Sequence, residues 1–158
     1  MNRKLKITAF IVILVMIGFF RETLFVNVNA LLYYKRSGES YPDYEISSAF
    51  RWLDVFPYQT LYASKWFITV GFIVIFWFVQ KIFIDTIFHE KKAALWLSML
   101  YLSLLLLAGL AFAGGWLFGH LNEGYRFSRI FMGLLQSPAP CMLLIPLTYF
   151  YKHNQNKI

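Results

Sequence analysis

Long apolar runs alternate along this chain with short segments that carry almost all of its charge. The runs cover residues 7–20, 66–79, 93–117 and 130–151. About 20 consecutive apolar residues are needed for an α-helix to cross the hydrocarbon core of a bilayer. The last two runs are long enough by themselves and contain no charged residue. The pattern therefore predicts an all-α integral membrane protein built as a four-transmembrane-helix bundle.

The first two runs are shorter and depend on their flanking residues to span. Lys4 and Lys6 precede the first run, and their long stems can lie along apolar surface while the ammonium groups reach the headgroups. Lys65 and Lys81 flank the second run in the same way, together with tyrosine and tryptophan residues typical of membrane interfaces. We therefore expect both runs to form membrane-spanning helices.

We expect one membrane domain over residues 1–158. The expected spans are residues 5–22, 62–82, 93–117 and 129–151, with outer loops at 23–61 and 118–128, an inner loop at 83–92 and an inner tail at 152–158. Within the first outer loop, Ile46, Phe50 and Leu53 recur at helical spacing. This spacing predicts a short amphipathic helix that lies on the outer leaflet or caps the bundle. Prolines at 138, 140 and 146 predict that the fourth span is kinked or partly unwound.

The placement of lysine and arginine predicts the orientation. Counted with the cations at the helix ends, the inner segments 1–6, 81–92 and 152–158 hold 8 Lys and Arg in 25 residues, whereas the outer segments 21–65 and 118–129 hold 7 in 57 residues. Cytoplasmic segments of membrane proteins are enriched in these residues. We therefore expect a multi-pass protein of the bacterial inner (cytoplasmic) membrane with both termini in the cytoplasm.

Composition supports a lipid environment and narrows the function. Hydrophobic residues make up 59% of the chain and charged residues only 15%, so a soluble fold could not cover its apolar surface. The net charge of +7 is explained by residues at helix ends, so membrane lipids, and not nucleic acid, are the expected partners. Cys141 lies deep in an apolar run, and the three histidines fall on different sides of the membrane. We expect no cofactor, no metal site and no catalytic residue.

A polar stripe on the fourth span is the strongest intramembrane pattern. Its members fall on one face of a continuous helix: Arg126, Arg129, Gly133, Gln136, Ser137 and Pro140. We also assign Pro138 to the expected partner or packing surface. Polar groups at membrane depth are costly unless they face protein or water. The stripe is either a contact or anion-facing surface near the outer leaflet, or two headgroup anchors followed by a glutamine that bonds a neighbouring helix.

Two further features sit near the outer boundary. Small residues recur at a spacing of four on the third span, in the rows Gly109–Ala113 and Ala111–Gly115–Gly119. Such rows let helices approach closely, within one chain or between two. Arg21 and Glu22 lie where the first span leaves the hydrocarbon. They either pair with each other or reach other charged residues of the outer side.

The order of these features resembles that of the small exosortase-associated membrane proteins of Bacteroidota, and best the exosortase F system-associated family or a closely related exosortase-accessory group. The matching segments are Arg21-Glu22-Thr23-Leu24-Phe25, Tyr41-Pro42-Asp43, Tyr125-Arg126-Phe127-Ser128-Arg129-Ile130, Gln136-Ser137-Pro138 and Ile145-Pro146-Leu147-Thr148-Tyr149-Phe150-Tyr151. The sequence departs from the family in separating its two arginines by two residues and in having Gln-Ser-Pro in place of Gln-Pro.

The resemblance implies a non-enzymatic accessory subunit. Its partner would be a larger membrane protein, an exosortase, which processes sorting signals at the outer face of the inner membrane and supplies the catalytic cysteine itself. The alternative is a small lipid- or anion-handling membrane transport protein that uses Arg126 and Arg129.

Overall fold

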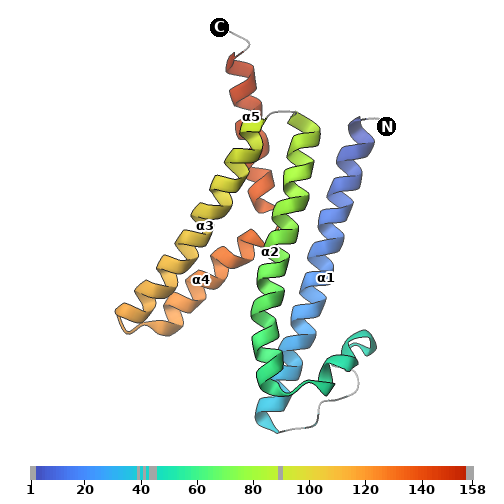
Figure 1. Cartoon of the computed structure of the whole chain (residues 1–158), viewed down its shortest axis with the longest axis vertical. Coiled ribbons are helices and arrows are strands. Elements are labelled where there is room, and N and C mark those ends of the chain that lie inside the picture. The colour runs from blue at the N-terminus through green and yellow to red at the C-terminus, as the bar shows by residue number, and fades with distance from the viewer. Residues whose placement is uncertain (1–2, 39, 41, 43–45, 89–90, 156–158) are drawn as a thin grey trace. The chain divides into compact units, whose positions relative to one another are not determined.

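The computed structural model is all-helical (Figure 1). It describes residues 3–38, 40, 42, 46–88 and 91–155, with the backbone alone at 3–4, 87–88, 91 and 148–155. The elements are α1 (Arg3–Ser37), the 3₁₀ helix η1 (Ser48–Val55), α2 (Tyr58–Phe88), α3 (Lys91–Leu117), α4 (Leu121–Leu135) and α5 (Ala139–Gln155). No strand occurs in these described ranges.

Several of these helices can cross a membrane by length and composition. Within the described residues, α1, α2 and α3 each meet the requirement alone. The helices α4 and α5 meet it together, as a pair bent by 63°. The helix α4 has 15 residues and is about 22 Å long, which is too short to span by itself. The chain therefore has three or four apolar helices able to cross a membrane, as expected of a multi-pass membrane protein.

The first helix is longer than the predicted first span. It continues past residue 22 to Ser37, through a stretch that was predicted as outer loop. No glycine or proline interrupts residues 19–37. The helix ends at Gly38, which has a φ of 73° and donates its N–H to the carbonyl of Tyr34 at 2.9 Å. Such a left-handed glycine is the usual end of a helix.

The predicted fourth span is not one helix. The helix α4 begins at Leu121, inside the predicted outer loop 118–128, and ends at Leu135. Proline removes a backbone donor and disfavours the helical conformation of the residue before it, which explains why the break lies at 136–138. The expected kink is therefore present, at the first of the three prolines. Pro146 lies inside α5 and does not end it.

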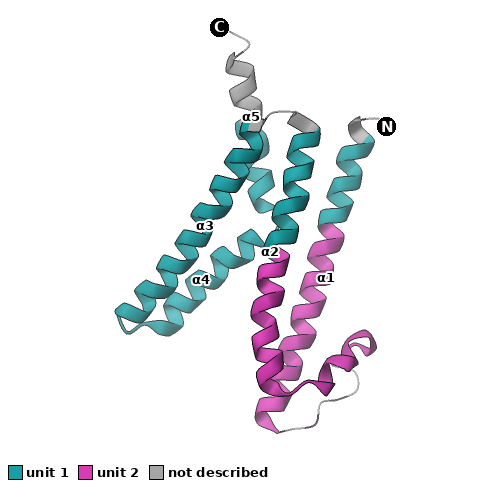
Figure 2. Ribbon diagram, viewed as in Figure 1, with its two compact units in different colours: residues 1–14, 73–158 teal, residues 15–72 magenta. Residues whose placement is uncertain are grey.

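The chain divides into two compact units (Figure 2). Unit 1 comprises residues 1–14 and 73–158, and unit 2 comprises residues 15–72. The helices α1 and α2 each contribute one end to each unit. We describe the two units separately.

In unit 2, the segment after α1 packs onto α1 and α2. The buried side chains are Val28, Leu31, Leu32, Ile46, Phe50, Leu53 and Leu61. Asn27, which is buried, accepts the Ser47 N–H at its Oδ1 (2.8 Å), and Lys35 Nζ lies 2.8 Å from Asp54 Oδ1. These bonds fix both ends of η1. The structure thus has a 3₁₀ helix within the segment that was predicted to be a short amphipathic helix.

In unit 1, α3 and α4 form a tight antiparallel hairpin. Gly119, with a φ of 74°, lies in the turn between them. The backbones cross where Gly115 faces Gly124: a Cβ built on Gly115 would lie 2.5 Å from the Cα of Gly124. No real side chain tolerates such a contact. The crossing therefore requires glycine on both helices. At this distance the two backbones can attract each other through van der Waals contacts and weak Cα–H···O hydrogen bonds.

We predict that Gly115→Ala or Gly124→Ala will destabilise the protein by about 1–3 kcal/mol, because the added methyl group must force the two backbones apart. The measurement is unfolding of the purified protein in mixed micelles by titration with a denaturing detergent. Gly109→Ala is the matched control, since a Cβ there meets nothing within 4 Å. Equal stability of the Gly115 and Gly109 variants would contradict the close crossing.

Candidate functional site

The break between α4 and α5 is held by a glutamine from another helix. Gln80 of α2 is fully buried, and its Nε2 donates a hydrogen bond to the carbonyl of Ser137 at 2.8 Å. Gln136 is buried beside it, with 3% of its surface exposed. Gln80 thus bonds one residue of the stripe that the sequence predicts, and the preceding residue of that stripe, Gln136, is buried as well. Gln80 was not singled out, because it directly follows the apolar run 66–79 and precedes Lys81, where a polar residue is expected at the end of a span.

The break also satisfies its own backbone groups. The Gln136 N–H reaches the carbonyls of Met132 and Gly133 at 3.3 and 3.2 Å. The Ser137 hydroxyl donates to the carbonyl of Leu134 (2.7 Å) and accepts the N–H of Ala139 (3.2 Å). In hydrocarbon, each unpaired backbone group costs several kcal/mol, so a broken helix is tolerated only where such partners exist. Gln136, Ser137 and Gln80 supply them.

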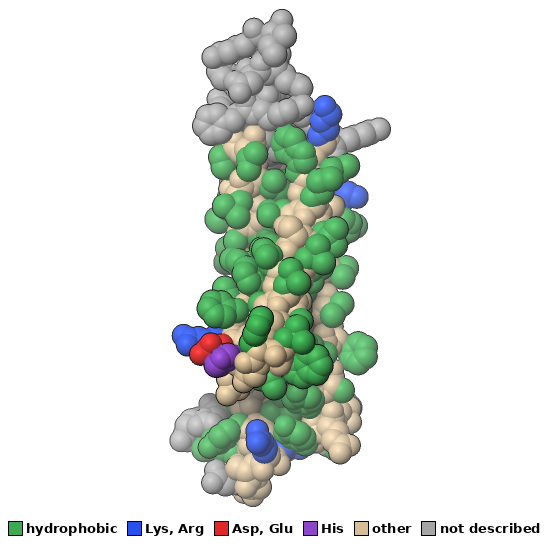
Figure 3. Space-filling view, turned by 90° about the vertical axis from the view of Figure 1, so that its left-hand side faces the viewer, with side chains coloured by type: hydrophobic (Ala, Val, Ile, Leu, Met, Phe, Trp, Pro, Cys, Tyr) green, Lys and Arg blue, Asp and Glu red, His purple; other side chains and the backbone are tan. Residues whose placement is uncertain are grey.

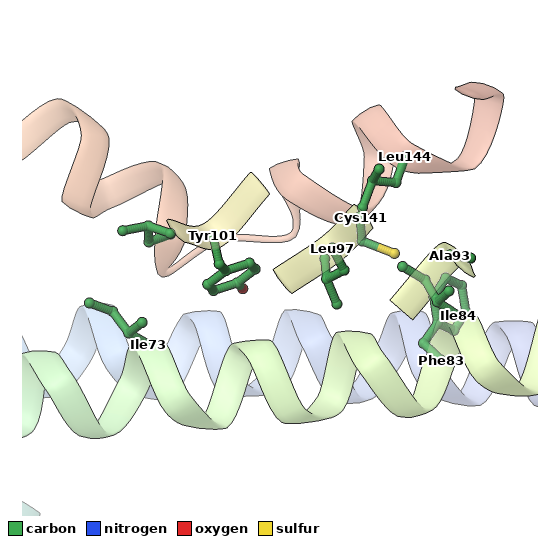
Figure 4. Close-up of a cluster of buried hydrophobic side chains, with 9 residues drawn as sticks. Ile73, Phe83, Ile84, Ala93, Leu97, Tyr101, Cys141 and Leu144 are labelled. Atoms are coloured by element: carbon green, nitrogen blue, oxygen red, sulfur yellow. The ribbon is translucent and has the colours of Figure 1, made fainter. Parts of the chain in front are cut away.

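A cluster of buried hydrophobic side chains surrounds this point (Figure 4). Its members come from α2, α3, α4 and α5: Ile73, Phe83, Ile84, Ala93, Leu97, Tyr101, Leu135, Cys141 and Leu144. Figure 4 shows the Tyr101 ring reaching from α3 towards α2. Cys141 is a free thiol, 2% exposed, among apolar side chains. A thiol in such surroundings packs as a small hydrophobic residue.

Two buried polar atoms of this region have no hydrogen-bond partner in the part of the chain that the structure describes. They are Oε1 of Gln80 and the hydroxyl oxygen of Tyr101. A buried unpaired acceptor or hydroxyl group costs about 1–3 kcal/mol. Each group therefore keeps the capacity for a further hydrogen bond inside unit 1.

The remaining members of the predicted stripe do not share one face. Arg126 and Arg129 are exposed on α4, on the side away from the buried Gly124. Gly133 is half-buried with open space around it, whereas Pro140 is buried on α5, beyond the 63° bend. Pro138 lies half-buried in the break. The stripe thus separates into an exposed arginine pair and a buried helix junction, because the helix that would align them is interrupted.

The small residues of α3 also separate into two groups. Ala111 and Gly115 face α4, and the Ala111 carbonyl lies 2.7 Å from a Cβ built on Gly124. Gly109 and Ala113 are exposed. Gly119 lies in the turn and contributes to neither face. The sequence reasoning missed Gly124, although a glycine flanked by helix-forming residues soon after a glycine turn was a usable signal.

Charged side chains of the hairpin gather at its tip (Figure 3). The face over α3 and α4 is otherwise mostly hydrophobic in that view, and His120 and Glu123 lie exposed at the tip. No hydrogen bond or ion pair joins Arg126 or Arg129 to the described part of the chain. The two guanidinium groups are therefore available to a partner outside this chain.

In unit 2, Arg21 and Glu22 lie in the middle of α1 and pair with each other at 3.4 Å. The Arg21 guanidinium also lies 5.4 Å from the centre of the Phe25 ring, one turn further along α1. Arginine over an aromatic face is a favourable cation–π contact. Asp54, one of the charged residues on the outer side that this pair could reach, forms an ion pair with Lys35 at 2.8 Å.

No group of three metal-ligating side chains forms among the described residues. The side chains of His89 and His153 lie outside that description.

Comparison with known proteins gives no match: no family model matches the sequence, and no curated protein or solved structure is significantly similar. The likeness to exosortase-associated proteins therefore stays a prediction from the residues quoted above.

We predict that Gln80→Leu will destabilise the protein by about 0.5–1.5 kcal/mol, because the Ser137 carbonyl loses its interhelical donor. Amide hydrogen exchange should rise in residues 136–142, where α5 begins. Gln59→Leu is the matched control, since Gln59 is exposed at the start of the same helix. An unchanged exchange rate at 136–142 would show that the break does not depend on Gln80.

Proposed function

We propose that this protein is a non-enzymatic accessory subunit of a larger, multi-spanning membrane protein of exosortase type. In this proposal it lies in the bacterial inner membrane with four spans, the fourth being the α4–α5 pair, and with both termini in the cytoplasm. Its role is to assist protein sorting or processing at the outer face of that membrane. The resemblance of the quoted segments suggests the partner, and the unused face of α3 supports the mode of binding.

The unused face of α3 is the observation that carries the proposal. One small-residue row of α3 is occupied, since Ala111 and Gly115 contact α4. The second row, Gly109 and Ala113, lies on the opposite, exposed side. In a bilayer, helices associate through close packing at small residues and not through a hydrophobic driving force. A row of this kind with open space beside it is suited to a helix of another protein.

The exposed arginines of α4 form a second, separate surface on the other side of the hairpin. Arg126 and Arg129 are exposed on the helix that packs beside α3. An arginine near the membrane boundary forms strong paired hydrogen bonds with a carboxylate. The proposed partner therefore offers a small-residue helix face to α3, and acidic groups close to the membrane surface can bind the arginines separately.

We predict that Gly109→Leu combined with Ala113→Leu will abolish co-purification with the partner, because the two added side chains fill the open row. The measurement is affinity purification from native membranes in mild detergent, followed by mass spectrometry. The double variant should fold normally, since a Cβ at Gly109 meets nothing within 4 Å.

Ser103→Leu is the matched control for this experiment. Ser103 is also exposed on α3 but lies about a quarter turn away from the row. It should leave co-purification intact. Recovery of a protein without any partner from native membranes would contradict the accessory function, whereas equal loss with Ser103→Leu would contradict only the assigned face.

A second candidate function, lipid or anion handling, is favoured by the two exposed arginines of α4, Arg126 and Arg129. We predict that native mass spectrometry will find an anionic phospholipid bound to the wild-type protein. Arg126→Ala combined with Arg129→Ala should remove it, because the phosphate loses both donors. Arg36→Ala, a change at an exposed arginine of unit 2, should not. Retention of the lipid by the double variant would exclude this candidate.

A further inference from the structure

The 3₁₀ helix η1 has three distinct sides. Residues three apart eclipse each other in a 3₁₀ helix, so each side is a row with a spacing of three. Phe50 and Leu53 form the buried row. Ser48, Arg51 and Asp54 form a polar row, and Ala49, Trp52 and Val55 form an exposed apolar row. We call this third row, together with the adjacent Phe56, the apolar edge.

The large apolar side chains of the apolar edge expose much of their surface. Trp52 exposes 60% of its surface, Val55 85% and Phe56 39%. The rings of Trp52 and Phe56 pack edge to face with centroids 6.1 Å apart. These side chains therefore form one continuous apolar surface. Its exposure to water is unfavourable by about 25 cal/mol per Å² of apolar area.

The rest of unit 2 holds this edge in place. The C-terminal end of η1 is tied to α1 by Lys35, whose Nζ contacts both the side chain and the carbonyl oxygen of Asp54, at 2.8 and 2.7 Å. The buried row packs against both helices of unit 2. Because the buried row is occupied, η1 cannot turn its apolar edge inward without losing Phe50 and Leu53 from the core.

The level of η1 along α1 indicates what covers the edge. Phe50 contacts Phe20 of α1, with ring centroids 6.3 Å apart, and Figure 2 shows η1 beside α1 within unit 2. The first turns of α2, which follow η1 along the chain, expose Tyr62 and Trp66 at 51% and 54%, and Lys65 between them bonds Asn29 of α1 at 2.7 Å. Exposed tyrosine and tryptophan next to a lysine at the end of an apolar helix are typical of the layer between hydrocarbon and headgroups. Ser47 and Asp54, at the two ends of η1, are bonded to Asn27 and Lys35 of α1, on either side of Asn29, so the apolar edge lies beside that layer.

We propose that the apolar edge inserts into the interfacial layer of the bilayer, so that η1 anchors unit 2 to the membrane surface. Trp52 lies among the headgroups, where its ring meets apolar chains and its indole N–H meets water. Val55 and Phe56 lie in the same interfacial layer, beside Trp52. The polar row, with Asp54 bonded to Lys35, faces water. Binding comes from apolar burial, so it requires no anionic lipid and no protein partner.

The test is a depth measurement on the full chain in phosphatidylcholine vesicles. A nitroxide label is placed at Val55→Cys or at Ser48→Cys, both in a Cys141→Ala background, and its collision rates with oxygen and with a water-soluble nickel complex are recorded. We expect a several-fold higher ratio of oxygen to nickel collisions at position 55 than at position 48, because the two rows of η1 face lipid and water. Adding anionic lipid should not change this ratio.

Three results would overturn the proposal. A label at position 55 that meets the nickel complex as freely as the label at position 48 would place the edge in water. A label shielded from both reagents would mean that protein covers the edge, either a second copy or another part of this chain. A high ratio that appears only with anionic lipid would mean that charge, and not the apolar edge, drives the contact. None of these outcomes depends on the proposed accessory function.

Discussion

The hydrogen bond from Gln80 to the Ser137 carbonyl is the contact on which the C-terminal part of this protein depends. A helix broken at membrane depth exposes carbonyl and N–H groups that lipid cannot satisfy. Here the chain supplies partners from the break itself and one from α2. Without them, the bend of 63° between α4 and α5 would be too costly to keep. The same bend lets α4 lie along α3 while α5 turns away to pack in the core of unit 1.

The glycine crossing is the second constraint, and it gives α3 its two unlike faces. Gly115 and Gly124 bring α3 and α4 so close that the Ala111–Gly115 row is fully used inside the chain. Gly109 and Ala113 are not needed for that contact and remain exposed. A helix that used all its small residues internally would have no close-packing surface left for a partner. The separation of the two rows around one helix is therefore what makes an accessory role physically reasonable.

The sequence predicted the helical class and the apolar helices well, because a long uncharged run has few other structures open to it in lipid. It also predicted a kink in the fourth span, because proline removes a backbone donor from a helix. It did not predict that α1 continues to Ser37, since hydropathy marks the membrane-crossing part of a helix and not its end; Gly38 marks the end. Gln80 and Gly124 were missed because their roles depend on residues distant in sequence, Ser137 and Gly115, that only the folded chain brings near.

The helix type of η1 shows how a small change in backbone geometry alters a functional expectation. With 3.6 residues per turn, Ile46, Phe50 and Leu53 would form one apolar stripe, and the segment would either cap the helices or lie on the membrane. With three residues per turn, two apolar rows exist side by side. Phe50 and Leu53 are buried against unit 2, whereas Trp52 and Val55 remain outside. The two roles that the sequence presented as alternatives are therefore compatible, because a different row of the same short helix is available for each.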